Sequence, residues 1–226
     1  MQPAIYNWIA ATPTAIFNSN NIPPVPGQRS FVLNGDLLNP LAPNSPIILG
    51  KIARVISITS TGDVSAVNFT IMGTYNGLSV SQTLAGPNAT TVYTTQFFNT
   101  VDSVTFNANV TSATNVGTGN AGVSPVTWGV TNWFTYDFFA PNSALTIQTK
   151  VMATVVNYSL EVTLDDVTTT PEASLTLFNP IAAMTNATTN QIGNINFPIR
   201  YARLKFNNTT TSVGSLTATF LQQGLQ

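Results

Sequence analysis

Cysteine and histidine are both absent from this chain of 226 residues, and charge is scarce, with seven Lys and Arg against eight Asp and Glu. Without Cys and His the chain can form no disulfide, zinc finger, haem ligand, Cys nucleophile or Ser-His-Asp triad. A net charge of −1 argues against general nucleic-acid binding, because that activity needs clustered Lys and Arg to neutralise phosphates. We therefore predict a protein that is not an enzyme, has no cofactor or metal, and binds neither nucleic acid nor a small-molecule substrate.

Long apolar runs are also missing, since no stretch approaches the roughly 18 uninterrupted apolar residues of a membrane-spanning helix. The first positive charge is Arg29, so the N-terminus lacks the basic segment that begins a secretory signal. The absence of Cys suits a reducing compartment. These features predict a protein without a membrane partner that is made and folded in a cytoplasm.

Neutral polar residues fill the place of the missing charges. There are 35 Thr, 25 Asn and 16 Ser, while charged residues make up only 7% of the chain, against the usual quarter or so. Because 43% of the residues are apolar, the chain can still build a core. An uncharged polar surface provides little electrostatic repulsion between molecules, so we expect much of this surface to contact other proteins. The alternative is an ordinary Thr-rich β protein of modest solubility.

The N-terminal segment, residues 1–49, holds eight of the 14 prolines. Proline fixes φ and removes a hydrogen-bond donor, so this segment cannot be helix or central strand for long. It also carries large apolar residues such as Trp8 and Phe17, which a solvated linker would not. The segment is predicted to be an extended arm that packs on its own domain or on a neighbouring copy.

From Lys51 onward the pattern has the period of two that β-strands show. Val67–Met72 alternates and leads into Asn76-Gly77, a strong hairpin signal, while residues 181–184 could form a single helical turn. Short strands separated by turn signals indicate an all-β protein made of antiparallel β-sandwich or jelly-roll-like modules. The predicted modules are residues 50–116 and 125–226 in tandem, separated by a Gly-rich segment, with one continuous β domain as the alternative.

The segment 158–164 has the cleanest alternation, with Leu160 and Val162 expected to face a core and Glu161 on the other face. Glu161 and Asp165 would lie about 13 Å apart along one strand, which exceeds the carboxyl spacing of glycosidases. Asp165 and Asp166 are interpreted as a solvated strand end with turn-forming Asp, the alternative being a loosely held Ca²⁺.

Two further groups could form an interface with another protein. Arg200 and Arg203, with Lys205, indicate either an ordinary solvent-exposed strand face or a contact in which arginine binds a neighbour's carboxylate. Trp128 and Trp133 belong to a run of aromatics that favours a buried core or interface over a platform for sugar or peptide. The candidate interface residues are therefore Trp8, Phe17, Trp128, Trp133, Arg200 and Arg203.

The segments Arg54–Asp63 (RVISITSTGD) and Val67–Gly77 (VNFTIMGTYNG) are similar to strand and hairpin patterns in virion proteins of tailed bacteriophages. Later segments continue the pattern, namely GPNAT from Gly86, FFNTVDSVT from Phe97, YSLEVTLDD from Tyr158, FPIRYARLKF from Phe197 and GSLTATFLQQ from Gly214. The resemblance covers most of residues 50–223 and includes no catalytic signature. It implies a β-rich structural subunit of a virion.

Composition and resemblance together predict a non-enzymatic virion subunit, assembled in a host cytoplasm, whose partners are copies of itself and other virion proteins. It would decorate or cement the head, or form part of the neck or tail. The alternative function is a receptor- or carbohydrate-binding β module at the tail tip, which would need an exposed aromatic patch.

Overall fold

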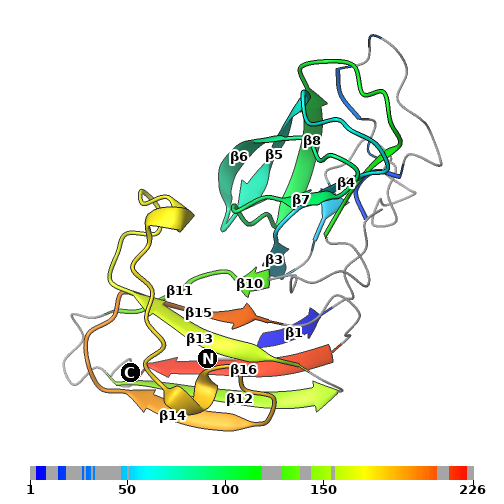
Figure 1. The fold of residues 1–226 in the computed structure, drawn as a ribbon. Helices are drawn as coiled ribbons and strands as arrows, with labels where there is room; N and C mark the ends of the chain where they lie inside the picture. Colours follow the sequence, from blue (N-terminus) through cyan, green and yellow to red (C-terminus); the bar gives the residue numbers. More distant parts are fainter. Residues whose placement is uncertain are drawn as a thin grey trace. The chain divides into compact units, whose positions relative to one another are not determined.

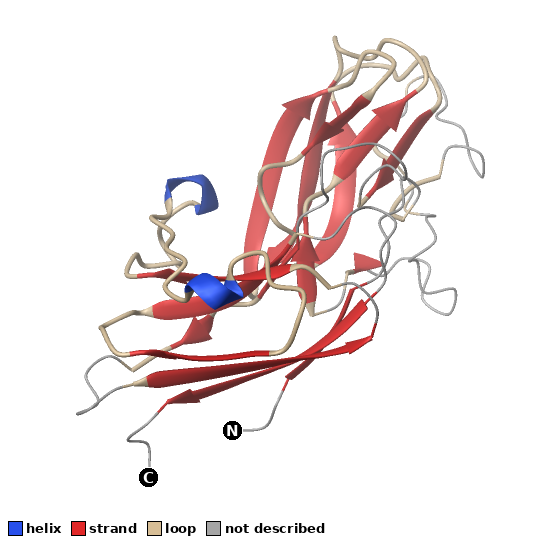
Figure 2. Cartoon of the chain, turned by 60° about the horizontal axis from the view of Figure 1, so that its bottom comes forward, coloured by secondary structure: helices blue, strands red, loops and turns tan. Residues whose placement is uncertain are grey.

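The computed structural model describes residues 4–8, 15–18, 27, 29–31, 33, 47–49, 51–118, 129–137, 144–153, 156–207 and 214–222. Its regular structure is almost entirely β-strand (Figure 1), and the strands within each part of the chain pair antiparallel. The helical elements in the described residues are two single 3-10 turns, η1 (Glu172–Ser174) and η2 (Ala182–Met184), both outside the sheets (Figure 2). The predicted all-β, sandwich-like class is confirmed, and η2 is the single helical turn expected at residues 181–184.

The chain divides into two compact units. Unit 1 comprises residues 1–10 and 128–226, and unit 2 comprises residues 11–127. The N-terminal segment is therefore shared between the units, because its first ten residues belong with the C-terminal half of the chain. The two predicted modules each gain part of the segment that was expected to be a separate arm.

Unit 1 is built from two facing sheets. Its strands are β1 (Ala4–Trp8), β10 (Gly129–Thr131), β11 (Phe134–Thr135), β12 (Leu145–Ala153), β13 (Tyr158–Thr163), β14 (Gln191–Ile195), β15 (Tyr201–Phe206) and β16 (Gly214–Gln222). One sheet, which we call the outer sheet, has the order β1-β16-β12-β14, and in the other β15 pairs with β13 on one side and with β10 and β11 on the other. The sheets meet through the stacked rings of Phe134 and Phe220, 5.1 Å apart, and through the Thr149 and Tyr158 hydroxyls, 2.5 Å apart.

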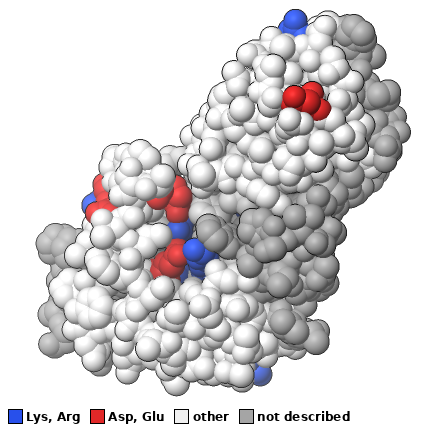
Figure 3. Space-filling model, viewed as in Figure 1, with Lys and Arg blue, Asp and Glu red and all other residues white. Residues whose placement is uncertain are grey.

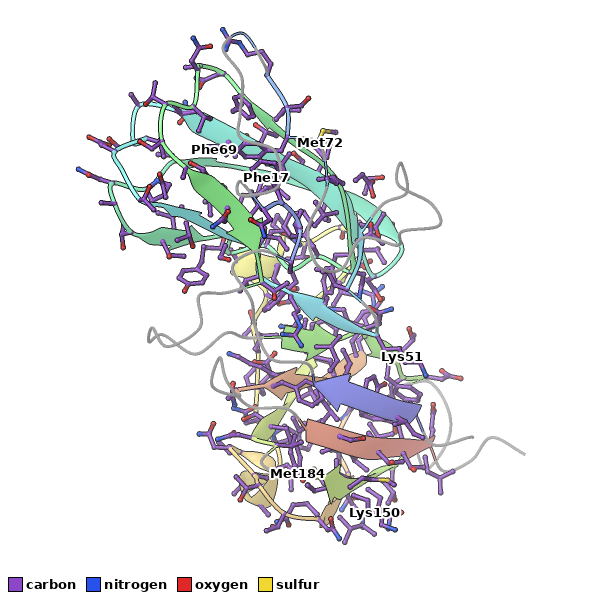
Figure 4. The ribbon with its side chains drawn as sticks, turned by 90° about the vertical axis from the view of Figure 1, so that its right-hand side faces the viewer. Phe17, Lys51, Phe69, Met72, Lys150 and Met184 are labelled. Atoms are coloured by element: carbon purple, nitrogen blue, oxygen red, sulfur yellow. The ribbon has the colours of Figure 1, made fainter. Side chains whose placement is uncertain are left out.

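The outer sheet shows the alternation that the sequence predicts. On β12, Leu145 and Ile147 are buried against the other sheet, whereas Gln148 and Lys150 are exposed, and Figure 4 shows Lys150 at the periphery of unit 1. β1 pairs along its whole length with β16, from Ala4 opposite Ala218 to Trp8 opposite Gly214. In this chain β1 is thus an edge strand of its own unit, which is the first of the two packing modes expected for the N-terminal segment.

Unit 2 also consists of two sheets around a core. Its strands are β2 (Ile47–Ile48), β3 (Ile52–Arg54), β4 (Ser57–Ser60), β5 (Asn68–Tyr75), β6 (Leu78–Ala85), β7 (Thr91–Tyr93), β8 (Thr100–Phe106) and β9 (Thr114–Gly117). The sheets have the orders β2-β8-β5-β6 and β7-β4-β9. Phe17 and Phe31, from the N-terminal segment, are buried between them and stack 4.1 Å apart. In Figure 4, Phe17 and Phe69 lie inside unit 2 and Met72 lies at its surface.

The hairpin predicted at Asn76-Gly77 is confirmed. Asn76 (φ 53°) and Gly77 (φ 77°) both have positive φ, as a two-residue type I′ turn requires, and β5 pairs in register with β6. Gly73 marks a break in the register between β5 and β8. A Cβ at Gly73 would lie 1.9 Å from the Thr100 carbonyl oxygen, so only glycine fits there.

Candidate functional site

The pairing of β13 with β15 brings opposite charges together in unit 1. Both strands alternate in sequence, and their antiparallel register places Glu161 directly opposite Arg203. Side chains opposite one another across a sheet are the closest cross-strand neighbours, so an acid and a base at these positions can pair. The local sequence and the register together therefore create an ion pair.

The ion pair is the centre of a buried cluster of four charges. Arg203 Nε donates to Glu161 Oε2 at 2.8 Å, and Arg203 Nη2 donates to Glu172 Oε1 at 2.5 Å. Lys205 Nζ lies 3.5 Å from Glu161 Oε1. The Arg203 side chain is only 1% exposed, yet its charge is balanced because two acids and two bases share the cluster. Figure 3 shows acidic and basic atoms side by side on unit 1, while most of the other described surface in view is uncharged.

An aromatic side chain covers the arginine. The Arg203 Cζ atom lies 4.2 Å from the centre of the Trp133 ring, and the Trp133 ring meets Tyr201 edge-on with centroids 6.3 Å apart. A guanidinium over a Trp face is stabilised by the ring's negative electrostatic potential, more so when water is excluded. Trp133 therefore helps to hold a charge in the interior.

The polar face of β13 is covered, so its predicted exposure is wrong. Every residue of β13 is buried, including Glu161 and Thr163. The chain after β13 folds back along its free edge, where Phe178 exchanges two backbone hydrogen bonds with Val162 and Ala187 exchanges two with Tyr158. The solvent-exposed face predicted for Arg203 is wrong, because its side chain is almost fully buried. The carboxylates that Arg203 binds, Glu161 and Glu172, belong to this chain, whereas the alternative prediction was a neighbour's carboxylate.

A turn and a second ion pair fix the loop that follows β13. The Asp166 carboxylate accepts hydrogen bonds from the Thr168 hydroxyl and backbone N–H, and Arg200 Nη2 donates to it at 3.0 Å. The Thr168 hydrogen bonds, aided by Arg200, hold the pKa of Asp166 below its usual value. Asp165 Oδ2 accepts from the Thr176 backbone N–H. The turn-forming interpretation holds for Asp166, whereas Asp165 binds a backbone N–H eleven residues away. No cluster of three acidic, His or Cys side chains that could hold a metal occurs among the described residues.

An apolar pocket of about 390 Å³ lies beside this loop. Three short segments line it, residues 162–164, 178–180 and 197–199. Leu164, Phe178 and Phe197 stand at its walls, each about half exposed, and no charged side chain contributes to the lining. The Thr163 hydroxyl already accepts a hydrogen bond from the Asp165 N–H. The pocket can therefore select an uncharged, apolar group by shape and by exclusion of water.

The ion cluster and the pocket have different chemical capacities. Glu161 is held by Arg203 and Lys205, so its carboxylate has little freedom to take part in proton transfer. Both ion pairs fix the chain that walls the pocket, since Glu172 and Asp166 lie in the loop between Leu164 and Phe178. The arrangement suits a rigid binding surface better than a reaction centre.

The structure places the predicted interface residues in several environments. Phe17 is in the core of unit 2, Trp133 and Arg203 form the cluster, and the Arg200 side chain is 38% exposed beside Asp166. The Trp8 backbone pairs in β1, but its side chain lies outside the described residues, as does all of Trp128.

Sequence reasoning missed the pocket altogether. Its wall residues Leu164, Phe178 and Phe197 come from three separate segments that only the fold brings together. The sequence did contain one signal, because Phe178 and Phe197 each stand within two residues of a proline, at Pro180 and Pro198. Proline fixes φ and favours turns, so both aromatics stand where the chain is expected to turn.

No known family model matches the chain, and no curated protein matches it. None of the helical segments among the described residues is long and apolar enough to cross a membrane.

Proposed function

We propose that this chain is a non-enzymatic structural subunit of a virion that associates with copies of itself and with other virion proteins. It decorates or cements a head, or forms part of a neck or tail. The observation that carries the proposal is how the charges are distributed. Seven of the 15 charged residues lie in the ion cluster and its adjoining loop, namely Glu161, Asp165, Asp166, Glu172, Arg200, Arg203 and Lys205.

Most of the remaining surface must therefore be neutral. Along the outward faces of β5 and β6, hydroxyl groups pair with each other, as at Thr70 and Thr83, whose oxygens are 2.7 Å apart. Charged side chains on sheets normally oppose association between proteins. A surface of Thr, Ser and Asn lacks that opposition, and burying it against another such surface costs less desolvation free energy than burying charged groups.

Sedimentation velocity of the purified chain over a range of concentrations and salt tests self-association. We expect oligomers that grow with concentration and that persist from about 0.1 M to 1 M NaCl, because screening affects only charged contacts. A monomer at every concentration would contradict self-association. Mass spectrometry and image reconstruction of purified particles test the virion role, which requires the chain to be present at a fixed, repeated position.

A receptor- or carbohydrate-binding module is the second candidate. The exposed rings of Phe178 and Phe197 at the pocket favour it, because sugars stack on exposed aromatics. The uncharged, largely apolar lining weighs against it, since sugar sites need several polar groups to bind hydroxyls. Binding to a glycan array that is lost in Phe178→Ala would support this candidate over a structural subunit.

A further inference from the structure

The exposed large apolar side chains of unit 1 form two groups. Among the described residues, Leu164, Leu177, Phe178 and Phe197 lie at or next to the pocket, and Ile5, Met152, Ile192 and Leu221 lie on the outer sheet. In unit 2 only Met72 and Leu78 are comparably exposed among the described residues. Eight of the ten such side chains therefore belong to two surfaces of one unit.

The pocket group is concave and fixed in shape. Two ion pairs hold the loop between Leu164 and Phe178, and the Arg200 backbone N–H bonds the Thr163 carbonyl oxygen at 3.0 Å near the third wall segment. A binding site whose walls are already ordered loses little entropy when it is filled. Such a pocket is a favourable receptor for a protruding aliphatic side chain.

The outer-sheet group lies on the outward face of the sheet formed by β1, β16, β12 and β14. Each of the four strands contributes one exposed apolar side chain, and Thr217, Thr219 and Gln148 lie between them. Lys150 is the one charged side chain among the described residues of this face. Its four strands hold 5, 9, 5 and 9 residues, so the face measures roughly 450 Å² in projection, a little over half of the roughly 800 Å² that each partner contributes to a standard interface.

We infer that unit 1 self-associates head to tail: the outer sheet of one copy packs against the pocket surface of the next, and one of its apolar side chains enters the pocket. This inference rests on the proposed self-association and names the surfaces that carry it. The occupant is a second copy because the chain itself carries both an apolar pocket whose lining has no charged side chain and an outward sheet face on which Lys150 is the one charge among the described residues. Contacts between two different surfaces of identical subunits repeat from copy to copy, so they build rings or filaments.

The test uses the full chain with charged substitutions on each surface. Phe178→Glu puts a charge at the pocket wall, and the double variant Ile192→Lys, Leu221→Lys puts charges on the outer sheet. Leu78→Glu and Met72→Lys, both on unit 2, are the matched controls. All these side chains are more than a third exposed, so melting curves should confirm that every variant folds. We expect the first two variants to weaken association at least tenfold in sedimentation velocity and the controls to match the unsubstituted chain.

Mixing the pocket variant with the outer-sheet variant distinguishes head-to-tail association from association through two identical surfaces. Each alone should be monomeric, while an equimolar mixture should give a heterodimer and nothing larger, because the mixture restores one intact contact. An unsubstituted chain that self-associates, with Phe178→Glu having no effect, would overturn this inference and leave the proposed function standing. Loss of association in the outer-sheet variant alone would indicate a face-to-face dimer and would also overturn it. A monomeric unsubstituted chain would overturn the proposed function itself.

Discussion

The two units bury very different groups behind similar sheets. Unit 2 is centred on aromatic rings, with Phe31 between Phe17 at 4.1 Å and Phe106 at 4.8 Å. Unit 1 buries the ion cluster of Glu161, Glu172, Arg203 and Lys205 under a loop. The comparison shows that a chain poor in charge can still place its few charges inside, where they fix one conformation of a loop instead of keeping the surface soluble.

The two units also differ in how far alternation in sequence predicts burial. β5 alternates buried with exposed or half-buried residues, as its sequence predicts, whereas β13 alternates in sequence but is buried at every position. The outward face of β5 is open, while on the face of β13 that carries Glu161 the loop residue Glu172 binds Arg203, and both side chains are almost fully buried. Alternation in sequence therefore reports that a residue belongs to a strand, but not that its polar face meets water.

The largest expected effect comes from breaking the ion cluster of unit 1. Arg203→Met should lower the free energy of unfolding by roughly 3–5 kcal/mol, because it leaves two buried carboxylates without their shared partner. Arg200→Met is the matched control, since its ion pair is partly exposed and should contribute at most about 1 kcal/mol. Urea unfolding followed by tryptophan fluorescence measures both. Equal losses would show that burial of the cluster does not matter for stability.

A core truncation in unit 2 should have a similar or slightly smaller effect with a different cause. Phe69→Ala on β5 should cost roughly 3–5 kcal/mol, because it removes a fully buried ring and leaves a cavity. Met72→Ala, on the opposite face of the same strand, should cost less than about 1 kcal/mol because that side chain is half exposed. Similar values at the two positions would mean that the outward face of β5 is covered in solution.

Removal of residues 1–10 should destabilise unit 1 and leave unit 2 unchanged. Unit 1 loses edge strand β1, so β16 amides that pair with it should exchange hydrogen roughly tenfold faster or more, while β5 amides in unit 2 should be unaffected. Hydrogen exchange read by mass spectrometry measures both regions in one experiment. Unchanged protection of β16, together with weaker self-association, would instead favour an arm that belongs to a neighbouring copy.

The smallest expected effect is a pH-dependent one at Asp166. The pKa of this carboxyl is lowered in the folded chain, so its stabilising contribution is present above its unfolded value near 4 and is lost as the pH falls through the folded value. Asp166→Asn should therefore lower the melting temperature slightly at pH 6–7, and the two curves should converge below about pH 3. Thr168→Val, which removes the hydroxyl donor, should act in the same direction. Curves that stay apart at low pH would show that the charge is not the cause.

Much of the fold followed from local patterns. The Asn76-Gly77 turn has a mechanism that depends on two residues alone, and alternation located β5 correctly. The N-terminal segment was harder, because prolines excluded helix but could not say where Ile5 or Phe17 would pack. The candidate site was harder still, since Glu161 and Arg203 have the sequence pattern of solvated charges, and only the fold shows that the loop carrying Glu172 packs on them.

The sequence by itself determined the all-β class, the turn chemistry and the scarcity of surface charge, because each depends on composition or on neighbours in the chain. Only the tertiary structure decided that β1 completes the sheet of the C-terminal half, that Arg203 is buried between two glutamates, and that Leu164, Phe178 and Phe197 form one pocket. The reason is physical. Backbone propensity and periodicity act over a few residues, whereas burial, ion pairing and concavity depend on which distant segments the packing brings into contact.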